Sequence, residues 1–265
     1  MKILYIGDIV GRIGRQAVGR ILPGLKKKHR ADLVVANAEN SAHGSGLNEN
    51  IVKELNQAGV DIFSLGDHAF SKEKDVSACF TSQLPVIRPA NYPPGVPGQG
   101  VYIQSVKGEN IAFAVLAGRV FMDKDFDCPF RVGDMILANL AKQNISAIIL
   151  EVHAEASSEK IALRHYFNGR VAAVLGTHTH VMTADSQLSA QGTAYITDIG
   201  MTGADEGVIG VDKENILKSF LTQIKYPHVI PEKGQAIFNA VLLNINLSAG
   251  RALSIKPIRE TREIH

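Results

Sequence analysis

Six short apolar runs recur along the first two thirds of the chain, separated from one another by more polar stretches. Each run is too short for a helix and is rich in Ile, Val and Leu, which is typical of a strand buried on both faces. The runs cover residues 3–6, 33–36, 60–65, 111–116, 147–152 and 171–175. They predict a sheet of buried strands, and such strands need other elements to cover them.

Helical patterns lie between several of these runs. Apolar residues at four-residue spacing predict one helix, and a possible Asn48 cap with Gly59 at the far end predicts another. The four-residue pattern consists of Ile13, Ala17, Ile21 and Leu25. Because strands alternate with helices, we expect an α/β fold.

The pattern changes from about Gly192, where strand-like segments follow one another with less helix. These segments cover residues 194–197, 236–247 and 252–258, and they suggest an antiparallel part of the architecture. Residues 89–100, "PANYPPGVPGQG", must form a loop. Strand-like segments continue on both sides of this loop without a change in composition, so we expect a single domain over residues 1–265.

The bulk composition restricts the class of protein. The 28 basic and 26 acidic residues nearly cancel, so no global field gathers nucleic acid or anionic membrane non-specifically. Cys79 and Cys128 are too few for a disulfide framework and lack the spacing of a zinc knuckle. No secretion signal and no apolar run of membrane-spanning length is visible. We therefore expect a cytoplasmic protein without a membrane partner.

Potential metal ligands follow five of the expected strands. They are Asp8 after "ILYIG", Glu39 and Asn40 after "LVVANA", Asp67 and His68 after "IFSLG", His153 after "AIILEV", and His178 and His180 after "AAVLGT". In open α/β sheets the functional site lies at the carboxyl ends of the strands. Carboxylate, amide and imidazole groups suit Fe, Mn, Zn or related divalent ions. Because so many groups exceed the needs of one ion, they suggest a pair of ions with one bridging carboxylate.

A structural interpretation competes for each of these residues taken singly. An Asp or Asn after a strand is usually a turn former or a helix cap, and a lone histidine is more often structural than a ligand. Independent caps, however, have no reason to place every potential ligand at the same end of successive strands. The segment "GTHTH", with its two histidines two residues apart, is the sharpest single signal of a metal site.

Several other functional motifs are excluded, because the required residues do not occur at the required spacing. The segment "GDIVGRIG" matches neither a dinucleotide-binding fingerprint nor a phosphate-binding loop, and "HAEAS" lacks the second histidine of a zinc-protease motif. The segment "SSEK" at residues 157–160 matches S-x-x-K, but the companion motifs of β-lactamases are absent. We interpret it as the first turn of a helix that continues through Ile161 and His165. His29, His228 and His265 are most simply solvated.

The ordered set of strand-end residues resembles the calcineurin-like metallophosphoesterases. More closely, the segments "GDIVGRIGR", "ANAENSAHGSGL", "RPANYPPGVPGQG", "HAEASSEKIAL", "GTHTHVMTAD" and "AYITDIGMTG" resemble the bacterial YmdB-like branch over nearly the whole chain. This resemblance implies a sandwich of two mixed β-sheets flanked by helices, with two metal ions at the strand ends. It also implies hydrolysis of phosphodiesters, notably 2′,3′-cyclic nucleotides, and phosphatase activity on model esters.

The resemblance further implies a role for each strand-end residue. Asp8, Asn40 and His180 would hold one ion, Asp67, His153 and His178 the second, and Glu39 would bridge them. The ions expected first are Fe or Mn, with Zn and Mg as alternatives. His68 would face the substrate and act in catalysis, or it would orient a neighbouring ligand instead. His43, in the loop "SAHGSGL", is a further candidate for contact with the substrate.

This sequence departs from the superfamily pattern at two positions. In "GDIVG" no histidine stands two residues after Asp8, and Asn40 is expected to fill that coordination place. In "GDH" the carboxylate of Asp67 replaces the usual asparagine, which would tighten cation binding and reduce the Lewis acidity left for the substrate.

The Asp67 departure supports a second hypothesis, a weakly catalytic regulatory protein that binds nucleotides or RNA and keeps the metal site. A binuclear hydrolase acting on amides is a third, without family support. The sequence is compatible with assembly of this chain into homo-oligomers.

Overall fold

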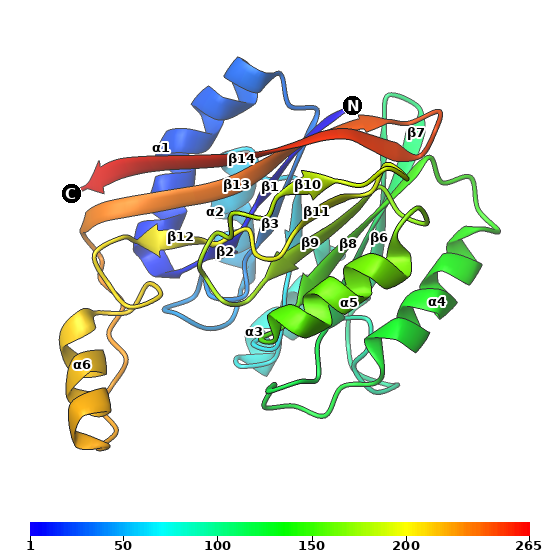
Figure 1. Cartoon of the computed structure of the whole chain (residues 1–265). Coiled ribbons are helices and arrows are strands. Elements are labelled where there is room, and N and C mark those ends of the chain that lie inside the picture. Colours follow the sequence, from blue (N-terminus) through cyan, green and yellow to red (C-terminus); the bar gives the residue numbers. More distant parts are fainter.

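Two β-sheets lie face to face in the computed structural model, which describes residues 1–265 (Figure 1). The first has eight strands in the order β2-β12-β13-β1-β3-β4-β5, with β14 paired to β13. Its strands are β1 Lys2–Ile6, β2 Asp8–Ile9, β3 Leu33–Asn37, β4 Ile62–Ser64, β5 Val86–Ile87, β12 Met201–Ala204, β13 Gly234–Asn246 and β14 Arg251–Ile264. Because β1, β3, β4 and β5 pair in parallel while β13 pairs antiparallel with β1 and β14, this sheet is mixed.

The second sheet has six strands in the order β10-β11-β9-β8-β7-β6. They are β6 Val101–Val106, β7 Glu109–Ala117, β8 Ala147–His153, β9 Ala173–Thr177, β10 Gln187–Leu188 and β11 Ala194–Ile196. The inner pairs are parallel, whereas β6 and β10 pair antiparallel at the two edges. The predicted sandwich of two mixed sheets is therefore confirmed.

Six helices accompany the sheets. They are α1 Gly11–His29, α2 Glu49–Gln57, α3 Glu73–Thr81, α4 Pro129–Leu140, α5 Ser157–Phe167 and α6 Lys213–Thr222. Helices α1 to α3 pack on the outer face of the first sheet, and α4 and α5 pack on the outer face of the second. Figure 1 shows α6 standing apart from this body, and only Ile216 of this helix is buried. No helix is both long and apolar enough to cross a bilayer.

The strands are buried because each sheet is covered on both faces. Tyr5 and Val35 point between the sheets and pack with Phe113 and Ile149 of the second sheet. Their neighbours along the strands, such as Leu4, face α1 and α2. Successive side chains of a strand point to opposite faces, so a strand with two covered faces is mostly apolar. This packing explains why the sequence shows continuous apolar runs and little alternation.

The helical predictions are confirmed, whereas one strand prediction needs correction. Asn48 caps α2 by accepting a hydrogen bond of 3.0 Å from the Ile51 N–H, and α5 begins at Ser157 as expected. The β13–β14 hairpin is antiparallel, but β11 pairs in parallel with β9. The expectation of an antiparallel arrangement for residues 194–197 therefore holds for the pairing of β11 with β10 and is wrong for its pairing with β9. The short strand β10 comes before β11 and runs antiparallel to it. The chain therefore reverses direction between β10 and β11, and β11 runs parallel to β9.

Candidate metal centre

Four potential ligands from both sheets meet where their strands end. Glu39 follows β3, Asp67 follows β4, His153 ends β8 and His178 follows β9. One donor atom from each lies within 4.8 Å of the others. Because parallel strands end at a common edge, two stacked sheets bring these side chains together although they are far apart in sequence.

Glu39 connects the two sides of this cluster. Its Oε2 accepts hydrogen bonds from the backbone N–H groups of Gly66 and His68, at 2.6 and 2.9 Å. Its Oε1 lies 3.0 Å from Nε2 of His153. His153 Nε2 also lies 2.8 Å from Oδ1 of Asp67. The Glu39 side chain is thus held by the backbone of the β4 end while one oxygen faces the histidine of the other sheet.

Gly66 makes this close approach possible. A Cβ atom at this position would lie 2.2 Å from the imidazole ring of His153. The ring is fully buried and cannot move aside. Any larger residue would therefore separate the β4 and β8 ends and pull the cluster apart.

Asp8, Asn40 and His180 form a second group beside the first. His180 Nε2 lies 3.8 Å from Oδ1 of Asp8 and 3.2 Å from Nδ2 of Asn40. Asp8 Oδ2 accepts a hydrogen bond of 3.2 Å from the His178 N–H, which ties this group to the first. Asp8 Oδ1 is buried and has no hydrogen-bond partner. An unpartnered carboxylate oxygen in this position is costly unless a cation binds it.

Each of the three histidines has a hydrogen-bond acceptor on its outer side. His153 Nδ1 lies 3.0 Å from Thr177 Oγ1, His178 Nε2 lies 3.2 Å from Glu155 Oε2, and His180 Nδ1 lies 2.9 Å from the Ile209 carbonyl. A proton on the outer nitrogen satisfies each contact and leaves the other nitrogen free to bind a cation. Such outer partners are the usual means of orienting histidine ligands in metal sites.

Glu151 extends this support and was not foreseen from the sequence. Its Oε1 accepts hydrogen bonds from Asn37 Nδ2 at 2.7 Å and from Thr177 Oγ1 at 2.8 Å. Its Oε2 accepts one of 2.6 Å from the Tyr5 hydroxyl. Burial and the Glu151 charge raise the pKa of Tyr5 well above its usual value. The available signal was a glutamate inside the apolar run "AIILEV". The nearby "HAEAS" segment likewise contains Glu155, whose role became visible only in three dimensions.

The electrostatics of the cluster also fit a cation. Burial, together with neighbouring carboxylates, raises the pKa of Asp8 to about 7. Burial alone would lower the pKa of His153, but the adjacent Glu39 and Asp67 carboxylates raise it well above the usual value. Without a cation, His153 must therefore hold a proton to balance the negative charge. The unpartnered Asp8 oxygen and the mixed carboxylate and imidazole donors together fit a divalent metal ion.

Comparison with known proteins identifies the family of this chain. A family model described as "YmdB-like protein" matches residues 4–258. The chain belongs to the YmdB-like family. This membership confirms the resemblance seen in the sequence motifs.

Relatives of the YmdB-like chain include proteins with described activities. The chain is 41% identical over 259 residues to a Bacillus subtilis (strain 168) protein named 2′,3′-cyclic-nucleotide 2′-phosphodiesterase, covering 97% of this chain and 96% of that protein. A Mycoplasma pneumoniae structure described as a novel phosphatase is 30% identical, with a TM-score of 0.92 over 100% of this chain and 94% of that one.

A more distant structure shows the fold alone. The NAD nucleotidase of Haemophilus influenzae is 14% identical, with a TM-score of 0.61 over 100% of this chain and 56% of that one.

The two histidines expected to contact the substrate differ in their surroundings. The His68 side chain is 42% exposed, and its Nδ1 lies 2.7 Å from Oδ1 of Asn40. It therefore combines contact with a candidate ligand and access to solvent. His43 is exposed in the loop after Asn40 and makes no hydrogen bond or ion pair with the cluster. The structure thus brings His68, but not His43, into the site.

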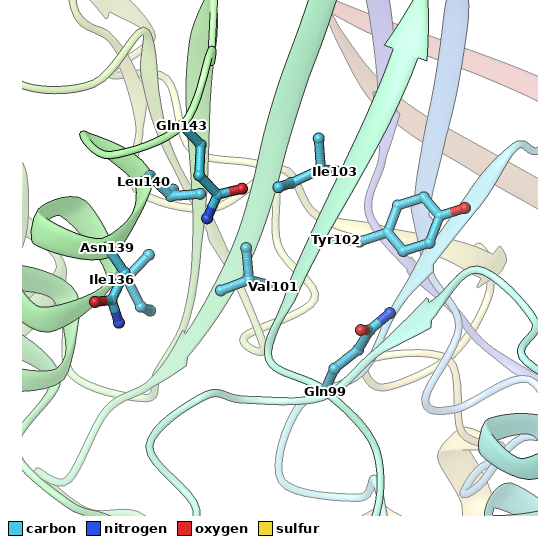
Figure 2. Close-up of a pocket in the computed structure, with 8 residues that line it drawn as sticks. All are labelled: Gln99, Val101, Tyr102, Ile103, Ile136, Asn139, Leu140 and Gln143. Atoms are coloured by element: carbon cyan, nitrogen blue, oxygen red, sulfur yellow. The ribbon is translucent and has the colours of Figure 1, made fainter.

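Two cavities, of about 550 and 490 Å³, have no candidate metal ligand of this YmdB-like chain in their lining. A cavity of about 490 Å³ lies between β6 and α4, lined by residues that include Val101, Ile136 and Leu140 (Figure 2). None of the expected site residues lines it. A smaller cavity of about 210 Å³ borders the centre at His180.

Metal uptake by the metal-free protein is expected to weaken as the pH falls below about 7, the raised pKa of Asp8. Below that pH the Asp8 carboxyl keeps its proton, and His153 also holds one because its pKa is raised. Both protons must leave before these groups can bind a cation. Titration calorimetry with Mn²⁺ should therefore show tighter binding at about pH 8 than at about pH 6, and more protons released per bound ion at about pH 6.

An Asp8→Asn variant is the control for this titration. It should bind the ion more weakly and with a smaller dependence on pH. Equal affinity of the wild-type protein at both pH values would contradict the prediction.

Proposed function

We propose that this protein is a metal-dependent phosphoric ester hydrolase whose substrates are phosphodiesters of the 2′,3′-cyclic nucleotide class. The observation that carries the proposal is the cluster of buried carboxylates and imidazoles at the shared strand ends, with one Asp8 oxygen left without a partner. The activities named for the Bacillus and Mycoplasma relatives support the same reaction class. We further propose that residues 1–265 act as a single domain.

In this proposal the centre holds two ions. Asp8, Asn40 and His180 would bind the first ion, Asp67, His153 and His178 would bind the second, and Glu39 would bridge them. Fe and Mn are the ions expected first, and Zn and Mg are alternatives. Glu39 suits the bridging role because its Oε1 faces His153 while two backbone N–H groups fix its Oε2.

Asn40 links the first ion site to His68. In the structure Asn40 Nδ2 faces His180, and Asn40 Oδ1 faces His68 Nδ1. To bind a cation through oxygen, the amide must turn by half a revolution, which places its NH₂ group beside His68. His68 Nδ1 then accepts a hydrogen bond, so its proton resides on Nε2.

The bound ions would supply an activated water and neutralise negative charge on the phosphate. The protein's own part in the reaction falls to His68. Its Nε2–H donates a hydrogen bond to a phosphoryl oxygen or to the leaving alkoxide. Glu39 Oε2 accepts a hydrogen bond of 2.9 Å from the His68 backbone N–H, and this bond fixes the backbone from which the His68 side chain extends.

Hydrolysis of two substrates by metal-depleted and metal-restored protein tests the proposal. The chelated protein is assayed with 2′,3′-cyclic AMP and with bis-p-nitrophenyl phosphate, before and after addition of Mn²⁺, Fe²⁺ or Zn²⁺. We expect no turnover without metal and restored turnover of both substrates with at least one ion. The absence of metal-restored hydrolysis of either substrate would overturn the proposal.

Asp67 favours a second candidate function, a regulatory nucleotide- or RNA-binding protein with little turnover. Its carboxylate stands within 2.8 Å of His153 Nε2 and within 3.3 Å of His178 Nδ1, where the superfamily usually has an asparagine. We expect Asp67→Asn to weaken metal binding and to raise kcat, because less negative charge leaves the ions more Lewis acidic. Steady-state kinetics at saturating metal measures this effect. Tight, metal-dependent binding of a cyclic nucleotide without product would favour the regulatory function.

A further inference from the structure

A fully buried ion pair lies directly behind the segment that carries His178 and His180. Lys160 of α5 and Asp198, which follows β11, both have side chains that are 0% exposed. Lys160 Nζ lies 2.8 Å from Asp198 Oδ2 and donates a second hydrogen bond, of 2.6 Å, to the Thr177 carbonyl. Lys160 is the lysine of the S-x-x-K segment at residues 157–160, and it has no role in the proposed reaction.

Asp198 in turn holds the residue between the two histidines. Its Oδ2 accepts hydrogen bonds from the Thr179 N–H at 3.0 Å and from Thr179 Oγ1 at 2.8 Å. Its Oδ1 accepts one of 2.8 Å from the Gly200 N–H. The carboxylate thus joins α5, the segment after β9 and the segment before β12 at one point.

The backbone on both sides of Thr179 adopts an unfavourable conformation. His178 has φ of 98° and His180 has φ of 66°, in the left-handed region that residues with a Cβ rarely occupy. Such a conformation persists only where the surrounding structure over-determines it. The Thr179 contacts to Asp198 are the side-chain hydrogen bonds that hold the midpoint of this strained segment.

We propose that the Lys160–Asp198 pair sets the metal affinity of the centre by holding the His178–Thr179–His180 segment in this conformation. Lys160 and Asp198 are positioning residues, since neither belongs to the ligand set. The inference rests on the proposed function, in which His178 and His180 bind different ions. Without the lysine, the buried Asp198 charge has no counter-charge, and it must take up a proton or turn towards water. Thr179 is then released, and both histidines lose their orientation together.

The affinity of the chelated protein for Mn²⁺, measured by titration calorimetry without substrate, tests this inference. For Lys160→Met we expect weaker binding of both ions by about 10- to 100-fold, the usual effect of losing a group that orients metal ligands. Leu163→Ala is the matched control. Leu163 is a buried residue on the same helix, in the apolar cluster with Phe167, so its loss should lower stability but leave Mn²⁺ affinity unchanged.

Two variants of Thr179 keep the inference testable if Lys160→Met does not fold. Thr179→Val keeps the shape of the side chain but removes the hydroxyl that bonds to Asp198, so Mn²⁺ binding should weaken. Thr179→Ser restores that hydroxyl and should restore the affinity. Unchanged Mn²⁺ affinity in both Lys160→Met and Thr179→Val would overturn the inference alone. A wild-type protein that takes up no metal would overturn the proposed function as well.

Discussion

Replacing Glu39 by glutamine is expected to lower metal-dependent hydrolysis by more than about 100-fold, beyond the usual effect of losing a group that only orients a ligand. Glutamine keeps an oxygen that can accept the hydrogen bonds from the Gly66 and His68 N–H groups. It removes the negative charge that faces His153 and that would bridge the two ions. Metal content by atomic absorption and kcat with bis-p-nitrophenyl phosphate measure the effect.

Glu159→Gln is the matched control for Glu39→Gln. Glu159 is also a buried glutamate, and its Oε2 accepts hydrogen bonds from the backbone N–H groups of Arg119 and Val120. It stands outside the ligand set, so its replacement should leave metal content unchanged. A Glu39→Gln protein with full metal content and wild-type turnover would show that Glu39 does not bridge the ions.

Replacing His68 by alanine is expected to lower kcat by about 10²- to 10³-fold, the range for loss of one hydrogen-bond donor to charge that develops in the transition state. The metal content should stay the same, because His68 touches Asn40 but is not itself a ligand in the proposed centre. The exposed ring accounts for this expectation, since only an accessible nitrogen can reach a phosphoryl oxygen or a leaving group. Pre-steady-state and steady-state kinetics with 2′,3′-cyclic AMP give the change in kcat.

Metal analysis of the same variant separates the two roles considered for His68. If His68 only orients Asn40, the alanine variant should lose metal in proportion to its loss of activity. His165→Ala, a change of an exposed histidine on α5, should alter neither quantity. Wild-type kcat in His68→Ala would exclude both roles.

Much of the fold was predictable because its signals are local. A strand covered on both faces is mostly apolar, so the apolar runs at β1, β3, β4, β7, β8 and β9 were visible without any knowledge of their partners. The Asn48 cap of α2 was visible for the same reason, since its hydrogen bond spans three residues. The parallel pairing of β11 with β9 was not visible in the sequence, because the direction of a strand depends on the path of the chain before it.

The candidate ligands were likewise predictable from their positions at strand ends. Polar residues directly after buried strands gather at one edge of a parallel sheet, whichever order the strands take. The motif resemblance then gave each residue an expected role. The distances among Glu39, Asp67, His153 and His178 agree with a shared site, while the roles themselves remain predictions.

The sequence by itself determined which residues stand at the strand ends, and the tertiary structure decided what holds them there. Tyr5 and Glu151 are 146 positions apart, and Lys160 and Asp198 are 38 apart, yet each pair forms a buried hydrogen bond. No local pattern relates such partners, because their contact depends on how the two sheets stack and on where α5 crosses the second one. Ligand identity follows from the short-range periodicity of the chain, whereas ligand orientation depends on contacts that exist only after the sheets have packed.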